Sequence, residues 1–155
     1  MFAKYTIPKA EIKAIGGGVP NDRIIYRACT RFEFFIFGKN AIEGIAFQKD
    51  GKNYKDGLSL ALSAADSVKK FPGNHGAIRI SVAAIHQLNR GLEVHFDTTD
   101  VTHVIIRNLP CMDRGLEEKA LALAVSAKLA AATQIESKKR IPVPAPPPAN
   151  LLSVD

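Results

Sequence analysis

Residues 23–37 read RIIYRACTRFEFFIF, and their alternation of apolar and charged side chains is the clearest strand pattern in the chain. Successive side chains of a strand point to opposite faces, so the even positions are predicted to face the core. These positions are Ile24, Tyr26, Ala28, Thr30, Phe32, Phe34 and Ile36. Arg23, Arg27 and Arg31 then share the opposite face, about 13 Å apart at ~3.3 Å per residue.

The rest of the first half supplies partners for this strand. Gly38-Lys39-Asn40 is typical of a turn, and residues 41–47 predict a returning strand, so 23–47 forms a hairpin. Residues 4–14 predict an edge strand, because Pro8 has no N–H to donate. Gly16–Gly18 predicts a flexible turn. Residues 58–70 have the spacing of an amphipathic helix, which Asp56 would cap.

The second half repeats this order of elements. We expect a strand at 77–82, a helical turn at 83–90, a hairpin of 92–97 with 101–107, and a helix over 115–137 capped near Asp113. The predicted fold class is therefore α+β, with an antiparallel sheet of about six strands in two strand-hairpin-helix units, residues 1–74 and 75–140. Both helices pack on one face of the sheet and leave the other face open.

The last residues differ in character from this single domain, 1–140. Residues 141–150, IPVPAPPPAN, contain five prolines, which favour an extended linker. The tip beyond it ends in Leu151, Leu152, Val154 and Asp155. An extended spacer with a short apolar and acidic tip resembles the tails of bacterial and phage single-stranded DNA-binding proteins. The resemblance implies that residues 141–155 bind a protein partner, and an unstructured C-terminus is the alternative.

Composition excludes several classes of protein. The chain has 155 residues, 46% apolar and 23% charged, as in soluble globular domains. No apolar run approaches the ~20 residues of a membrane span, and the N-terminus lacks a signal-peptide pattern. Cys29 and Cys111 are far apart, so neither a CxxC zinc site nor a disulfide scaffold is predicted. We expect a cytoplasmic protein of a bacterial or other host cell.

Basic and aromatic residues are concentrated in the first half. Residues 1–74 hold 12 basic and 7 acidic residues, a net charge of +5, and ten of the eleven aromatic residues. Cations that meet phosphates and rings that stack on bases suit a single-stranded nucleic acid. The structural alternative is that a strand-rich half collects aromatic side chains for its core.

The first hypothesis is therefore a non-enzymatic protein that binds single-stranded DNA or RNA. Tyr54 would stack on bases, with Phe35 or Phe37. The predicted phosphate contacts are Arg23, Arg27, Arg31, Lys39, Lys49, Lys52 and Lys55.

Neither an active site nor a metal site is predicted. A hairpin centred on Thr99 would place His95 opposite His103, but no third ligand is evident. Nucleotide-binding and hydrolase motifs are absent from the sequence, and no cofactor is expected. A buried thiol is the favoured interpretation of Cys29. Cys111 precedes a predicted helix, whose N-terminus lowers a thiol pKa, but without a neighbouring base no catalytic role is expected.

The alternative hypothesis is a self-assembling structural or adaptor subunit, for example of a viral or secretion particle. In that case the chain forms homo-oligomers without binding nucleic acid. The alanine-rich helix and the tail would be its interfaces, and open sheet edges would invite strand addition.

Overall fold

The computed structural model describes residues 15–36, 41–50 and 57–139. It confirms an α+β fold built on one antiparallel sheet. Seven strands, three α-helices and two 3-10 turns form the described part of the chain: β1 (Ile15–Gly18), β2 (Ile24–Ala28), η2 (Phe32–Phe34), η3 (Gly44–Phe47), β3 (Leu58–Ala61), α2 (Ala64–Lys69), β4 (Gly76–Ser81), α3 (Val82–Gln87), β5 (Glu93–Asp97), β6 (His103–Arg107), α4 (Leu116–Ala131) and β7 (Gln134–Lys138).

Strands from the two halves of the sequence are interleaved in the sheet, so that the pair β3-β2 of the first half lies between strands of the second half. The order is β1-β5-β6-β3-β2-β4-β7, and every pair is antiparallel. β3 of the first half lies between β6 and β2, and β2 lies between β3 and β4. Neither half therefore builds a sheet of its own, in contrast to the two predicted units.

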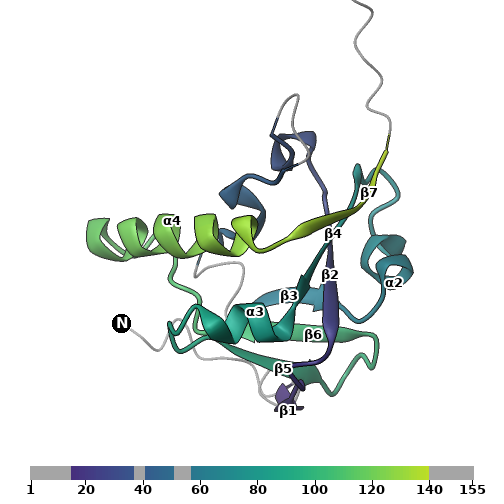
Figure 1. Cartoon of the computed structure of the whole chain (residues 1–155), viewed down its shortest axis with the longest axis horizontal. Coiled ribbons are helices and arrows are strands. Elements are labelled where there is room, and N and C mark those ends of the chain that lie inside the picture. The colour runs from purple at the N-terminus through teal and green to yellow at the C-terminus, as the bar shows by residue number, and fades with distance from the viewer. Residues whose placement is uncertain (1–14, 37–40, 51–56, 140–155) are drawn as a thin grey trace, which may run out of the picture.

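The two faces of the sheet carry different helices. Register places Ile25 opposite Ile80, and both are buried in a core that includes Val125 and Leu129 of α4. Tyr26 and Arg79 point to the other face. Figure 1 shows α3 and α4 on one side of β2 and β4 and α2 on the other. The prediction that both long helices cover one face is therefore wrong.

Of the predicted hairpin over residues 23–47, only a short antiparallel return between residues 34–36 and 41–43 forms in the described residues. β2 ends at Ala28, and two 3-10 turns and a single Phe35–Ile42 bridge follow it. Phe34 and Phe35 are both buried although they are adjacent in sequence. A regular strand would send one of them to each face, so the chain leaves the pleat to bury both rings.

The predicted phase of β2 is reversed. Ile25 is fully buried, whereas Ile24 is 42% exposed. Both side chains are equally apolar, so alternation alone does not decide which one meets the core. The packing of α3 and α4 against one face of β2 decides it.

The segment predicted as one helix, 58–70, divides into a strand and a shorter helix. β3 inserts between β2 and β6, and α2 starts after Ser63, whose Oγ accepts a hydrogen bond from the Asp66 N–H at 3.1 Å. Ser63 is thus the cap in place of Asp56, which lies outside the described residues. Gly57 adopts φ +133° beside the Ile106 carbonyl, where a Cβ atom would lie 2.1 Å from the oxygen.

The long helix is shorter than predicted. α4 ends at Ala131, and Gln134–Lys138 forms β7, which pairs with β4 at the edge of the sheet. Gly115, rather than Asp113, is the residue before the first turn. β4 would otherwise be an edge strand, and Ile135 packs against the core from β7. Pairing of β7 therefore overrides the helical pattern of this segment.

Other predictions are closer to the structure. The strand at 77–82, the helical turn after it and the hairpin of 92–97 with 101–107 are confirmed as β4, α3 and β5-β6. The register differs, because His95 pairs with Ile105 and so does not face His103. Gly16–Gly18 is a strand paired with β5 rather than a flexible turn. The predicted edge strand at 4–14 and the tail at 141–155 lie outside the described residues.

Candidate nucleic-acid interface

The face of the sheet that carries α2 is rich in polar and aromatic side chains. Strand register places on it a row of residues from β5, β6, β3, β2 and β4. They are His95, His103, Arg107, Ser59, Tyr26 and Arg79. This face, which we call the α2 face, differs from the apolar face under α3 and α4.

A cleft of about 480 Å³ lies between α2 and the α2 face. Tyr26 of β2 and His103 of β6 line it from the sheet. Lys70 and Phe71, which follow α2 directly, line it from the helix side, and Thr30 lies at the end beyond β2. Volumes of this size accommodate small organic ligands, and the walls combine apolar surface with a few polar groups.

The end of α2 holds Lys70 and Phe71 in place. The Phe71 N–H donates to the Val68 carbonyl at 2.9 Å, and the Asn74 side chain donates to the Phe71 carbonyl at 2.7 Å. Phe71 nevertheless remains 45% exposed. It is the one aromatic residue among the exposed large hydrophobic side chains of the described segments.

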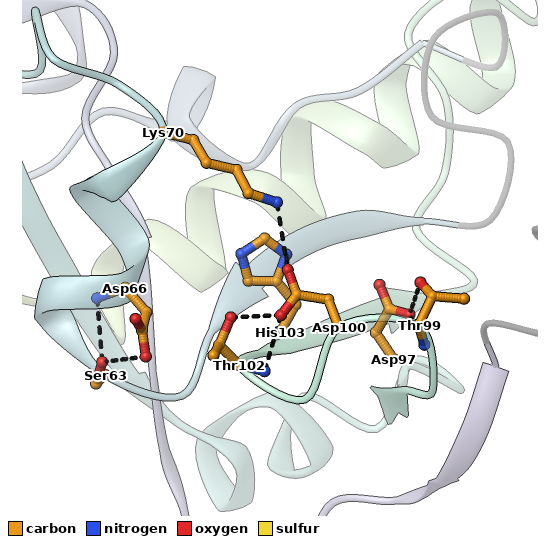
Figure 2. Close-up of polar contacts among 8 residues, drawn as sticks. All are labelled: Ser63, Asp66, Lys70, Asp97, Thr99, Asp100, Thr102 and His103. Atoms are coloured by element: carbon orange, nitrogen blue, oxygen red, sulfur yellow. Dashed lines mark hydrogen bonds and ion pairs between the residues drawn. The ribbon is translucent and has the colours of Figure 1, made fainter.

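Asp100 joins two basic groups at the rim of the cleft (Figure 2). Lys70 Nζ lies 3.3 Å from the Asp100 carboxylate, and His103 Nδ1 lies 3.4 Å from the same oxygen. The Thr102 hydroxyl and backbone N–H donate to the other oxygen at 2.6 and 3.0 Å. These hydrogen bonds, helped by Lys70 and His103, hold the pKa of Asp100 well below its usual range. Asp100 therefore stays ionised and partly neutralises both basic groups.

Arg27 does not extend into solvent from a charged stripe, as the alternation predicts. Its Nε donates to the Ala46 carbonyl at 2.7 Å, and its Nη1 donates to the Ser59 carbonyl at 3.1 Å. The guanidinium thus connects η3 with β3. Two of its N–H groups are thus held by backbone oxygens, and Arg27 also lines the cleft on the α2 face beside Tyr26.

The other two arginines of the predicted stripe are exposed but not aligned. Arg23 precedes β2, and Arg31 lies beyond its end, where its Nε is 3.6 Å from Glu33. Because the strand stops at Ala28, the period of two that would align the three arginines does not persist. No described strand carries all of Arg23, Arg27 and Arg31.

Lys49 is buried, contrary to its predicted role as a phosphate contact. Its side chain is only 7% exposed, and its Nζ donates to Cys111 Sγ at 3.1 Å. The Met112 N–H donates to the Lys49 carbonyl at 2.8 Å, so both side chain and backbone connect this segment to the one before α4. Cys29 is a second buried thiol, and burial raises its pKa to about 12. Both cysteines are buried, as the sequence favours for Cys29.

The predicted stacking residues are divided between the core and the undescribed segments. Phe35 is buried, and Lys138 Nζ lies 5.0 Å from the centre of its ring, so it presents no free face to a base. Lys39, Lys52, Tyr54, Lys55 and Phe37 lie outside the described residues, as do Leu151, Leu152, Val154 and Asp155.

The histidines do not form a metal centre in the described part of the chain. His95 contacts the Gly16 carbonyl and Glu93, each at 2.9 Å. The hydrogen bond from His95 lowers the pKa of Glu93. Within residues 15–36, 41–50 and 57–139, no three His, Cys, Asp or Glu side chains are close enough to share a metal ion.

Comparison with known proteins identifies no relative. Neither a protein-family model, nor a curated protein, nor a solved structure matches this chain. None of the described helices combines the length and apolar character required to cross a membrane. The functional argument therefore depends on the geometry of the α2 face.

Sequence reasoning overlooked the residues of the cleft. The even position of Tyr26 predicts a core side chain, Lys70 is the last residue of the predicted helix 58–70, and Phe71 lies just beyond it. Two local sequence signals indicate the start of α2 and the turn at Asp100, which together position the residues of the cleft. Ser63 three residues before Asp66 is typical of a helix start, and Asp100 two residues before Thr102 is typical of a turn stabilised by a carboxylate.

Proposed function

We propose that the protein is a non-enzymatic, cytoplasmic protein that binds single-stranded DNA or RNA through the cleft on its α2 face. The observation that carries this proposal is the placement of Tyr26 and the exposed ring of Phe71 in one cleft with Lys70 and His103. The site requires neither metal nor cofactor for this role.

The cleft offers a base and its phosphate separate partners. Aromatic rings stack on unpaired bases of any sequence, and each stacked base contributes about 1–3 kcal/mol. Lysine and protonated histidine attract the adjacent phosphate. A duplex keeps its bases paired and stacked, so its bases cannot enter a cleft between a helix and a sheet. The site therefore favours a single strand.

Asp100 lowers the affinity that the cleft can have for a phosphate. The Asp100 carboxylate holds Lys70 Nζ at 3.3 Å, and an incoming phosphate must share that ammonium with it. Binding of a phosphate therefore costs part of an existing ion pair. We expect moderate affinity with a clear dependence on salt.

The test is fluorescence anisotropy of a labelled strand of about 30 nucleotides, long enough to span several sites of the ~4–16 nucleotides that single binding modules occupy. A matched duplex and an RNA run in parallel at two salt concentrations. Phe71→Ala should weaken binding about tenfold or more through lost stacking. Lys70→Ala should weaken binding and lower the salt slope by about one.

Lys69→Ala is the matched control, because Lys69 is exposed, adjoins Lys70 and does not line the cleft. It should leave affinity near that of the unmodified protein. Equal losses for Lys69→Ala and Lys70→Ala would mean that general charge, and not the cleft, attracts the strand. Absence of binding at low salt would refute the proposal.

A partner for the C-terminal tail belongs to the same proposal. Deletion of residues 141–155 should leave strand binding intact, since the cleft lies wholly among residues 26–103. The second candidate function, a self-assembling subunit without nucleic-acid binding, is favoured by a different observation, the apolar outer face of α4.

A further inference from the structure

α4 carries apolar residues on both sides. One side packs against the core through Ala122, Val125 and Leu129. The opposite side is exposed, with Leu116 86% exposed and Leu123 44% exposed. Exposed large apolar side chains in a row indicate a contact surface rather than a solvated helix face.

The exposed apolar residues follow the spacing of a helix that packs against another helix. Six of them, Leu116, Ala120, Leu123, Ala124, Ala127 and Ala131, form what we call the outer stripe of α4, whereas Leu121, 43% exposed, lies outside it. Steps of four and three residues keep one stripe on one side of a helix. Figure 1 shows α4 extending beyond the sheet, on the side away from α2.

We propose that the outer stripe pairs antiparallel with the same stripe of a second copy of this chain. A two-fold axis between Leu123 and Ala124 brings Leu123 of each copy against Ala124 of the other. The same axis brings Leu116 level with Ala131, and Ala120 level with Ala127. Each leucine then meets an alanine, so large side chains fill the spaces left by small ones.

Charge on one flank of the stripe is complementary in the antiparallel arrangement. Glu117 and Lys128 are both exposed and lie eleven residues apart, about three turns, so they share one flank. In the antiparallel pair Glu117 of one copy lies within about 3 Å, along the axis, of the level of Lys128 in the second copy.

The other flank carries no opposing charge. Lys119 is at the same height along the axis as Lys128 of the second copy, but the two lie on opposite flanks. Lys119 instead lies beside Ser126 and Ala130 of the second copy, which are uncharged. The residues that meet across the two-fold axis are therefore complementary in size and in charge. Two Glu117–Lys128 pairs form by symmetry.

The expected dimer is reversible, because the contact is small. A helix of 16 residues is about 24 Å long and offers less than the ~800 Å² per partner of a standard interface. The inference does not depend on nucleic-acid binding, since α4 and α2 lie on opposite sides of the sheet (Figure 1) and no residue of α4 lines the cleft.

The test is sedimentation velocity of the full chain over a wide concentration range, up to about 1 mM, where even weak pairs associate. The unmodified protein should shift from monomer to dimer. Glu117→Lys and Lys128→Glu should each weaken the dimer about five- to tenfold, because two attractive pairs become repulsive. The double exchange Glu117→Lys with Lys128→Glu should restore it.

The double exchange separates pairing from helix stability. Each single exchange places a charge unfavourably to the helix dipole, and the double exchange combines both effects. Restored association in the double variant therefore cannot arise from a more stable helix. Lys119→Glu is the control and should dimerise like the unmodified protein.

Leu123→Glu provides a second route, because it places a charge at the centre of the contact. It should remain monomeric and fold normally by circular dichroism, since glutamate is as good a helix former as leucine. A monomer at every concentration of the unmodified protein overturns the inference. So does a dimer that survives Leu123→Glu, or single exchanges without effect.

Discussion

Asp100 illustrates how one side chain organises the rim of the cleft. It accepts hydrogen bonds from Thr102 and lies within ion-pair distance of His103, both in its own turn, and of Lys70, which follows α2. The folded protein therefore holds the Asp100 proton less tightly than the unfolded chain does. A carboxylate with a lowered pKa stabilises the folded state above its unfolded pKa, about 3.9.

We predict that Asp100→Asn lowers the free energy of unfolding at pH 7. The difference from the unmodified protein should shrink as the pH falls below about 4, where the unfolded carboxylate takes up its proton. Urea unfolding of both proteins at neutral and acid pH measures this. The exposed Asp22→Asn is the control, and an Asp100→Asn deficit that persists undiminished in acid would contradict the argument.

The same variant should change strand binding in the opposite direction. Removal of the carboxylate charge frees the Lys70 ammonium for a phosphate, so affinity should increase although stability decreases. Residue-level alternation could not identify Asp100, because its importance arises from partners at Lys70, 30 residues away in sequence, and at His103.

α2 is the element on which the proposed site depends. It contains six residues, too few for a stable isolated helix, so its cap and its packing on β2, β3 and β4 maintain it. Ser63 caps α2, and Ser81 caps α3 in the same way, with its Oγ accepting from the Ala84 N–H at 3.1 Å. The two caps form a matched pair on opposite faces of the sheet.

We predict that Ser63→Ala and Ser81→Ala each destabilise the protein by about 1 kcal/mol. Only Ser63→Ala should also weaken strand binding, because α2 positions Lys70 and Phe71 while α3 contacts the core. Chemical denaturation and anisotropy on both variants check this. Equal binding losses would show that general stability, rather than the position of α2, governs the site.

The first-half strands β2 and β3 lie between strands of the second half, and this arrangement determines how the whole molecule folds. β2 and β3 are bordered by β4 and β6, which come from the second half of the sequence. A fragment that ends before residue 75 would leave both outer edges of this pair open, and a two-stranded ribbon is at best marginally stable in water.

We therefore predict that fragments 1–74 and 75–155 do not fold separately. Neither should show a cooperative thermal transition, and mixing them should restore one, because the pairs β2-β4 and β3-β6 form only between them. Circular dichroism during heating measures both results. A cooperative transition in either fragment alone would contradict this view of the sheet.

Local sequence signals determined the secondary structure where a segment has one strong preference. Ile78 and Ile80 alternate with Arg79 in β4, and the turn after Asp97 connects a hairpin whose two strands follow each other directly. In these segments burial and propensity agree, and the partner lies near in sequence. The α+β class and the antiparallel sheet follow from such segments.

Tertiary structure decided the elements whose partners are distant. Leu58–Ala61 has the pattern of a helix but becomes β3, because it fills the gap between β2 and β6. Gln134–Lys138 becomes β7 because β4 has a free edge there. Backbone hydrogen bonds to distant strands outweigh the weak preferences of short segments, which differ by less than about 1 kcal/mol per residue.

The site shows the same division. The sequence by itself determined that basic and aromatic residues are abundant, but it predicted Arg27, by alternation, and Lys49, by its place in a turn, as phosphate contacts in solvent. The tertiary structure buries Lys49 against Cys111 and joins Arg27 to the Ala46 carbonyl. It also brings Tyr26, Phe71 and His103 to one cleft. A periodic pattern specifies which side chains share a face, whereas packing of α2, α3 and α4 specifies which face meets solvent.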